Sequence, residues 1–164
     1  MKFEIKNRWN GELIFAVETT SWKLAVEAAI KSKANLSKAN LSKANLSEAD
    51  LSWANLSEAN LRPIKHDIWG ILLHAQPEVA ALRQAIIEGR INGSVYEGDC
   101  ACLCGTIANA RKCAVSDLRG IQADSGSLAE RWFLAIREGD TPESSIIAKL
   151  TLEWVDEFVT LIGS

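Results

Sequence analysis

The chain has 164 residues, of which 48% are hydrophobic, and its formal net charge is −3. This length suits one compact domain or two small ones. The sequence contains no run of eighteen apolar residues, so it predicts no membrane-spanning helix. The charge is uneven, because residues 1–65 sum to +3 and residues 66–164 to −6. Since nucleic-acid binding needs a stronger basic surface than this, we expect neither a nucleic-acid nor a membrane partner.

The first predicted element is a β-hairpin over residues 3–18. Phe3 and Ile5 alternate with charged neighbours, as in a strand with one buried face. Asn10 and Gly11 then form a pair that is typical of a two-residue hairpin turn. The return strand is more continuously apolar.

A helix is predicted to follow the hairpin and to end near Lys31. Thr20 or Ser21 can cap its first turn, because a side-chain hydroxyl accepts from an unpaired backbone amide there. Its apolar residues share one side. We therefore assign residues 1–32 to a hairpin plus a helix that caps the open end of the next segment.

A five-residue repeat runs from Lys33 to Arg62. In an α-helix a five-residue step rotates ~140° past a face, and in a strand an odd step flips the side chain to the other face. A chain that turns one corner per repeat instead points every small and branched side chain inward. The predicted repeat core is Ala34, Leu36, Ala39, Leu41, Ala44, Leu46, Ala49, Leu51, Ala54, Leu56, Ala59 and Leu61.

This tandem A(N/D)LSX pattern over residues 33–62 resembles the pentapeptide-repeat family. The resemblance implies a right-handed, four-sided β-helix with one pentapeptide per side, and six repeats then make about one and a half coils. It also implies that the Asn and Asp positions bond to neighbouring backbone at the turns. Because so short a solenoid needs caps, we expect a plug between two other parts of the chain.

The same resemblance fixes a register. Residues twenty apart should stack on adjacent coils at roughly the 4.8 Å strand spacing. This register predicts Lys38 beside Glu58 and Lys33 beside Trp53. Both contacts are local stabilisers.

Residues 63–164 are predicted to form a mainly α-helical domain with a small β element, so that the whole chain is α+β. Pro63 ends the repeats, since proline cannot donate to a further strand pairing. The last helix carries the strongest apolar stripe, with apolar residues four apart. Helices are predicted from Asp67 to about Ala75, Pro77 to Gly89, Gly105 to Lys112, Ser127 to about Glu138, and Pro142 onward, with two short strands at 95–96 and 100–104.

Four cysteines are crowded into this part of the chain. Cys100, Cys102 and Cys104 alternate, so on a strand they share one face, and Cys113 follows. Four thiolates can hold zinc, but C-x-C wraps the metal poorly, and buried core cysteines are the more frequent case. Redox chemistry is a third possibility. Their spacing does not resemble a disulfide framework, and we expect a reduced, cytoplasmic protein without a signal peptide.

A set of polar and aromatic residues forms the candidate ligand-binding site. Arginines pair bidentately with phosphates, aromatic rings stack on bases, and the helix start at Gly105-Thr106 can receive an anion. The alternative is that these groups are solvated helix-end charges and core aromatics. The candidates are Tyr96, Thr106, Asn109, Arg111, Arg131, Trp132 and Arg137. We predict neither a catalytic residue nor a cofactor.

The stretches GTIANARK (105–112) and AERWFLAIREGDTPE (129–143) resemble small pentapeptide-repeat proteins of tailed bacteriophages and prophages. This second resemblance implies a cytoplasmic accessory protein that binds and neutralises a host factor, for example in counter-defence. Relatives that bind DNA gyrase mimic DNA with a long acidic rod. The six repeats here carry mixed charge, which argues against that target.

Two other functions stay open. A sponge would sequester a nucleotide-derived signalling molecule in a pocket of the C-terminal part or at a subunit interface. An enzyme using cysteine with His66 or His74 is the least supported by the residue pattern. We also expect a homo-oligomer, since a short β-helix end and an amphipathic last helix favour pairing.

Overall fold

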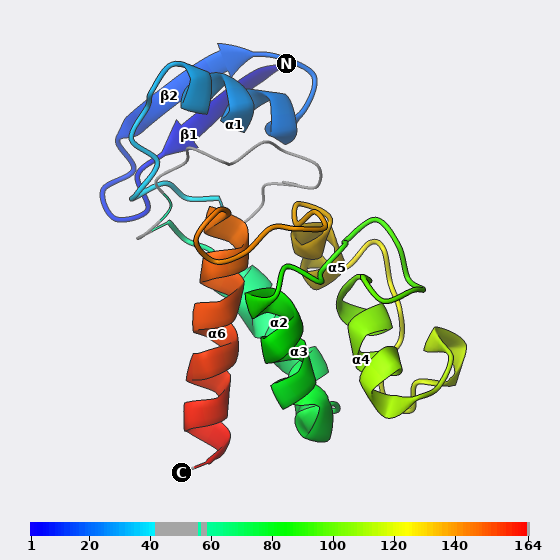
Figure 1. Cartoon of the computed structure of the whole chain (residues 1–164). Helices are drawn as coiled ribbons and strands as arrows, with labels where there is room; N and C mark the ends of the chain where they lie inside the picture. The colour runs from blue at the N-terminus through cyan, green and yellow to red at the C-terminus, as the bar shows by residue number, and fades with distance from the viewer. Residues whose placement is uncertain (42–55, 57–58, 164) are drawn as a thin grey trace.

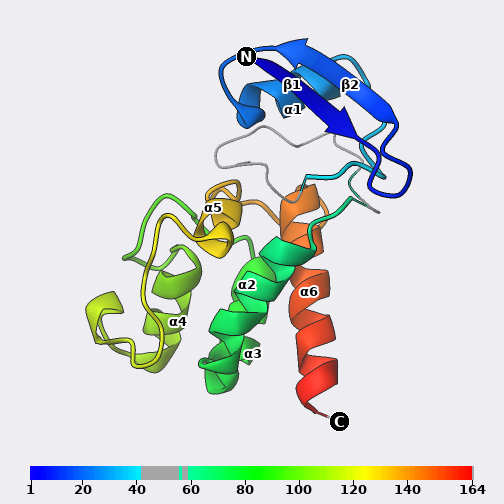
Figure 2. The ribbon, with the colours of Figure 1, turned by 180° about the vertical axis from the view of Figure 1, so that it is seen from behind.

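The computed structural model describes residues 1–41, 56 and 59–163, and these residues have an α+β fold (Figures 1 and 2). The hairpin and α1 form an N-terminal unit at one end of the molecule, and the C terminus lies at the other end, beyond α6. In the described residues no helix is long and apolar enough to span a bilayer. The elements are β1 (Lys2–Lys6), β2 (Leu13–Glu18), α1 (Trp22–Lys31), α2 (Arg62–Leu73), η1 (Gln76–Glu78), α3 (Val79–Ile87), α4 (Leu103–Arg111), η2 (Val115–Asp117), α5 (Leu128–Phe133) and α6 (Ile146–Ile162).

The hairpin is confirmed, but its turn is longer than predicted. β1 and β2 pair antiparallel with Ile5 opposite Phe15, and the register shifts after Ile5 so that Lys6 lies opposite Leu13. The connection therefore covers residues 7–12. The two-residue turn at Asn10-Gly11 is wrong, because the Asn7 amide donates to the Glu12 carbonyl at 2.8 Å and the Asn7 carbonyl accepts from Gly11 at 3.0 Å, which closes a longer turn.

The helix α1 forms as predicted and packs on the hairpin. Ser21 caps it, since its hydroxyl accepts from the backbone amide of Leu24 at 3.3 Å. Val26 and Ala29 are fully buried. The rings of Phe3 and Trp22 meet edge to face at 5.3 Å, an arrangement that aromatic pairs favour.

Residues 38–40 of the second repeat lie between the hairpin and the last repeat. On one side the amide of Arg8 donates to the Lys38 carbonyl at 2.8 Å, and the amide of Asn40 donates to the Lys6 carbonyl at 2.8 Å. On the other side the amide of Asn60 donates to the Ala39 carbonyl at 2.9 Å. The backbone edge at this end is thus covered by the hairpin, where we had expected α1.

One contact and one recurring turn in the described repeats agree with the expected spacing of twenty residues. The Asn60 side-chain amide donates to the Asn40 side-chain oxygen at 3.4 Å. Ala39 donates to the carbonyl of Leu36, and Ala59 repeats this turn with Leu56, both at 3.0 Å. The same turn therefore occurs twice, one predicted coil apart.

Six predicted core residues of the repeats are buried, and Ala34 is half-buried. The Asn35 oxygen accepts from the Ser37 amide at 3.0 Å, which is the local turn bond that the resemblance implies. A β-helix is not shown. The buried residues are Leu36, Ala39, Leu41, Leu56, Ala59 and Leu61; Ala44, Leu46, Ala49, Leu51 and Ala54, with the partners Trp53 and Glu58, lie outside the described residues.

The predicted helices of the C-terminal part form, but three boundaries differ. α2 begins at Arg62 with Pro63 in its first turn, where proline needs no donor. α6 begins after Ser145, whose hydroxyl accepts from an amide of the first turn. α5 ends at Phe133 and not near residue 138, because the amide of Ile136 donates three residues back to Phe133 and the amide of Arg137 donates to the Asp140 carboxylate.

The predicted strand at 100–104 is wrong. Residues Ile91 and Ala101 form only an isolated parallel bridge, and α4 begins at Leu103. A short buried apolar run reads alike as strand or helix, which explains the error. Gly105 allows the backbone of α4 to lie against the backbone of Tyr96, since a Cβ at Gly105 would lie 2.3 Å from the Tyr96 carbonyl oxygen.

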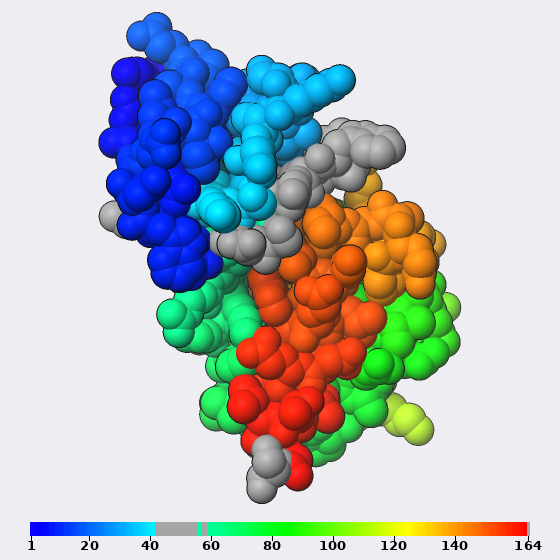
Figure 3. All heavy atoms as spheres, turned by 90° about the vertical axis from the view of Figure 1, so that its left-hand side faces the viewer, coloured from blue at the N-terminus to red at the C-terminus, as the bar shows by residue number. Residues whose placement is uncertain are grey.

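The helix α6 runs along one face of the helical part (Figure 3). Its stripe is buried at Trp154 and Phe158, whereas Ile162 is exposed. The Trp154 carbonyl accepts from the ring nitrogen of Trp69 at 2.9 Å, which ties α6 to α2. These contacts confirm that the last helix packs in the core.

A core substitution in the repeats tests their inward register. We expect Leu36→Ala to lower the free energy of unfolding by ~2–4 kcal/mol, because it removes a fully buried side chain and leaves a cavity. Leu13→Ala, at a side chain that is 52% exposed, should change it by less than ~1 kcal/mol. Urea unfolding followed by circular dichroism measures both. Equal effects of the two variants would contradict the buried position of Leu36.

Candidate functional site

A groove along α4 brings together two of the predicted ligand-binding residues. It consists of two adjoining cavities of about 750 and 380 Å³ that share Arg90, Asp99 and Asn109, and Thr106 lines the smaller one. However, the Thr106 hydroxyl donates to the Ala101 carbonyl at 3.1 Å, and the Asn109 amide donates to the Gly98 carbonyl at 2.7 Å. Both side chains therefore hold the loop that shapes this groove.

A second cavity, the Lys23–Arg137 cleft, lies between α1 and the loops of the helical part. It has a volume of about 630 Å³. Of the predicted residues only Arg137 lies here, and the sequence did not single out Lys23, which comes from the N-terminal unit. The lining residues are Lys23, Asn92, Ser94, Leu134, Ile136, Arg137 and Glu138.

The walls of the cleft are held by a close backbone contact at Gly93. Its amide donates to the Ile136 carbonyl at 3.0 Å, and a Cβ on it would lie 1.9 Å from the Phe133 carbonyl oxygen. Only glycine fits at this distance. The adjacent Asn92 side-chain oxygen accepts from the Ser94 amide and hydroxyl, at 3.2 and 2.6 Å. The polar wall is thus fixed without a ligand.

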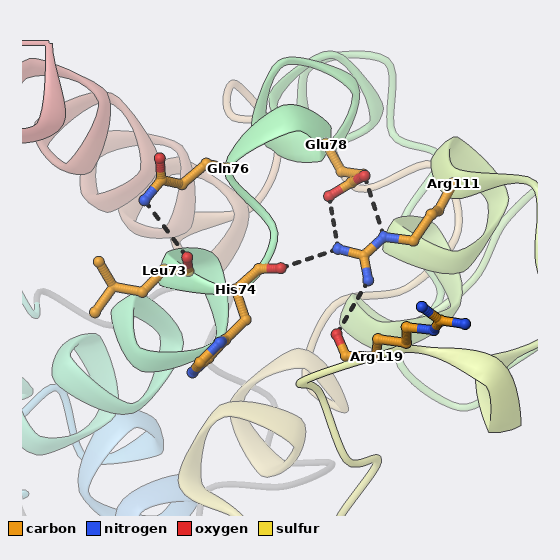
Figure 4. Close-up of polar contacts among 6 residues, drawn as sticks. All are labelled: Leu73, His74, Gln76, Glu78, Arg111 and Arg119. Carbon is orange, nitrogen blue, oxygen red and sulfur yellow. Dashed lines mark hydrogen bonds and ion pairs between the residues drawn. The ribbon is translucent and has the colours of Figure 1, made fainter.

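Arg111 lies in a structural clamp (Figure 4). Its guanidinium donates to both carboxylate oxygens of Glu78, at 3.1 and 2.9 Å. It also donates to the carbonyls of His74 at 2.9 Å and Arg119 at 3.2 Å. The clamp joins α4 to η1, to the end of α2 and to the loop after η2. Hydrogen bonding from Arg111 lowers the pKa of Glu78.

The other predicted ligand-binding residues lie apart from both cavities described above. Trp132 is buried and its ring nitrogen donates to the Thr151 hydroxyl at 2.8 Å. Arg131 is a half-buried residue of α5. Tyr96 is 37% exposed, and burial together with nearby Glu130 raises its pKa to about 12. The seven candidates therefore do not line one common cavity.

The cysteines are free thiols, and two of them are fully buried. Burial raises the pKa of Cys102 to about 12 and raises that of Cys104 as well. Burial and neighbouring Glu138 raise the pKa of Cys100. A protonated thiol is a poor nucleophile and a poor metal ligand. Among the residues that the structure describes, no three His, Cys, Asp or Glu side chains are arranged to hold a metal.

Glu130 is the chemically unusual residue that the sequence did not reveal. Its position three residues after Ser127 predicts a surface capping box, and the Ser127 hydroxyl does accept from the Glu130 amide at 3.1 Å. The Glu130 side chain instead turns inward, is only 3% exposed, and leaves Oε1 without a hydrogen bond. Burial raises its pKa, and bonds from Cys104 and Cys102 partly oppose this.

Comparison with known proteins adds one finding. Residues 32–62 match the family model described as "Pentapeptide repeats (8 copies)". This segment consists of pentapeptide repeats. The match does not extend to the hairpin or to the helical part. No curated protein and no solved structure matches the chain.

The clamp between Arg111 and Glu78 makes a pH-dependent contribution to stability. The pKa of Glu78 is lowered from 4.5, so its contribution is full above pH 4.5 and is lost as the pH falls through the folded-state pKa. We expect Glu78→Gln to cost ~1–3 kcal/mol at pH 7 and less at pH 3. Asp156→Asn, which breaks an exposed pair with Arg83, should cost less than ~1 kcal/mol. Urea unfolding at both pH values measures this, and a pH-independent loss in Glu78→Gln would contradict it.

Glu130 should give the stability of the protein the opposite pH dependence to that of Glu78. Because its pKa is raised, the stability of its protonated form is full below pH 4.5 and is lost as the pH rises through the folded-state pKa. Glu130→Gln cannot ionise. We therefore expect the stability of this variant relative to the native chain to rise between pH 4 and pH 8, by on the order of 1 kcal/mol or more. Parallel unfolding free energies for both chains over this range would contradict a neutral buried acid.

Proposed function

We propose that this protein is a non-catalytic binding protein that binds and neutralises a factor of its host cell. The side chains with the strongest chemistry are engaged inside the fold. Arg111 is bonded to Glu78, and the thiols of Cys102 and Cys104 are buried with raised pKa values. These positions disfavour the cysteine enzyme, and they leave recognition to the surface.

The observation that carries the proposal is the exposed apolar end of α6. Val159, Leu161 and Ile162, here called the α6 tip, are 43%, 57% and 44% exposed. Earlier in the same helix Trp154 and Phe158 are only 8% and 3% exposed. Figure 3 shows this red end of the helix at the surface. Large apolar side chains gathered at one exposed end are typical of a protein-binding surface.

Charge indicates the kind of partner. The exposed face of α6 carries acidic Glu153, and residues 66–164 sum to −6, whereas Glu157 nearer the α6 tip is paired with Lys65 at 2.5 Å. A complementary surface is therefore basic around an apolar pocket. We propose further that the target is a cytoplasmic host protein and that the role is counter-defence, as the sequence resemblance of residues 105–112 and 129–143 implies.

The pentapeptide repeats belong to the same proposal as a structural plug. We propose that they form the four-sided coil, and the bond between Asn40 and Asn60 supports its period of twenty residues. The hairpin already pairs with residues 38–40 of the second repeat, which leaves the α6 tip at the far end of the molecule. We also propose a homo-oligomer, and light scattering that gives only the 17.9 kDa monomer would contradict this.

The second candidate function is sequestration of a nucleotide-derived signalling molecule. One observation favours it: the Lys23–Arg137 cleft brings two cations to a cavity of about 630 Å³. A sponge of this kind needs tight binding and no catalytic group.

Affinity capture tests the protein-binding function. We expect the tagged native chain to capture one protein in stoichiometric amount from a bacterial host lysate. The double variant Val159→Ser, Ile162→Ser should capture at least tenfold less of this protein, because substituting a hot spot in an interface centre weakens binding by ~2 kcal/mol or more. Leu24→Ser is the matched control, since it removes a leucine that is 44% exposed on α1. Equal capture by all three chains, or capture of no partner, would contradict the proposal.

A further inference from the structure

We propose that the Lys23–Arg137 cleft binds the phosphate groups of a small, nucleotide-sized anion, held between α1 and the loop that follows α5. The inference deepens the second candidate function and does not depend on the α6 tip. It rests on the cations that line the cleft, on the fixed wall beside them and on the size of the cavity.

Arg137 differs from three other arginines of the helical part. Arg83, Arg90 and Arg111 are each held by a carboxylate, at 2.6, 2.5 and 2.9 Å. Among the described residues no carboxylate pairs with the guanidinium of Arg137. Its backbone is engaged instead: the Arg137 amide donates to the Asp140 carboxylate at 2.8 Å, and the Arg137 carbonyl accepts from the Asp140 amide at 3.0 Å. An exposed guanidinium at a cavity wall can take a phosphate bidentately.

The charge of the cleft lining differs from that of the surrounding helical part. Residues 66–164 are acidic as a whole, so a cavity in which Lys23 and Arg137 outnumber the single acid Glu138 is a local exception. Glu138 also lies beside Cys100, where it helps to raise the pKa of that thiol. The net charge of the lining favours an anion over a cation or a neutral sugar.

The polar wall of the cleft is preorganised. Gly93 fixes the Asn92–Ser94 wall against residues 133–136, so these polar groups need no reordering to meet a ligand. Leu134 is half-buried and adds an apolar surface to the lining, which suits a base or another flat group, whereas Ile136 is buried. A volume of about 630 Å³ lies within the ~300–1,000 Å³ range of small-molecule sites.

Calorimetric titration with ADP and with inorganic pyrophosphate tests the inference. At low salt we expect the native chain to bind both, and Arg137→Gln and Lys23→Gln each to weaken binding at least tenfold, since each removes a charge-assisted contact. Tighter binding of ADP than of pyrophosphate would assign the apolar wall to the base, and equal binding would assign the site to phosphate alone. Lys149→Gln, which removes an exposed cation of α6, is the matched control and should stay within twofold.

Two results overturn the inference. One is no binding of either probe by the native chain at millimolar concentration. The other is equal weakening by Lys149→Gln and Arg137→Gln, which would show only general charge attraction. The Val159→Ser, Ile162→Ser variant separates the two proposals, because it should keep its ADP affinity while losing the captured protein. Hydrolysis of ADP during the titration would instead overturn the non-catalytic function and leave the site in place.

Discussion

One steric constraint positions both loops of the Lys23–Arg137 cleft: the backbone of Gly93 lies against the carbonyl of Phe133. The gap admits no Cβ, and the Gly93 amide donates to Ile136 across it. Beyond Phe133 the amide of Ile136 donates to the Phe133 carbonyl at 2.9 Å, and the amide of Arg137 donates to the Asp140 carboxylate at 2.8 Å, so α5 does not continue. Residues 134 and 136–138 line the cleft together with residues 92 and 94. The Gly93 contact therefore holds together the two loops that carry these residues.

Two glutamates show how the same side chain serves the fold in opposite ways. Glu78 is ionised and held by Arg111, so its pKa is lowered and its contribution needs a pH above 4.5. Glu130 is buried beside Cys102 and Cys104, so its pKa is raised and its ionised form is disfavoured. Both carboxyl groups thus serve the packing of the fold, and in our proposals binding falls to cations and apolar residues at the surface.

The sequence predicted elements where local chemistry decides and failed where distant contacts decide. The fivefold repeat placed Leu36 and Ala39 inward, and the capping hydroxyl of Ser21 located α1. The run around Cys102 was read as a strand, because a buried helix of this length has no distinguishing period. The clamp on Arg111 and the inward turn of Glu130 depend on partners 33 and about 28 residues away, which no local pattern reports. Of the cleft, only Arg137 was predicted, since Lys23 reaches it from the N-terminal unit.

The proposed anion site depends on a cleft to which α1 and the loop after α5 both contribute. A chemical-shift titration of the ¹⁵N-labelled native chain with pyrophosphate tests this most directly. The account predicts that the amide signals of Lys23, Ser94 and Arg137 shift together along one saturable curve. Shifts confined to the α4 groove, at Asn109 and Lys112, would contradict it.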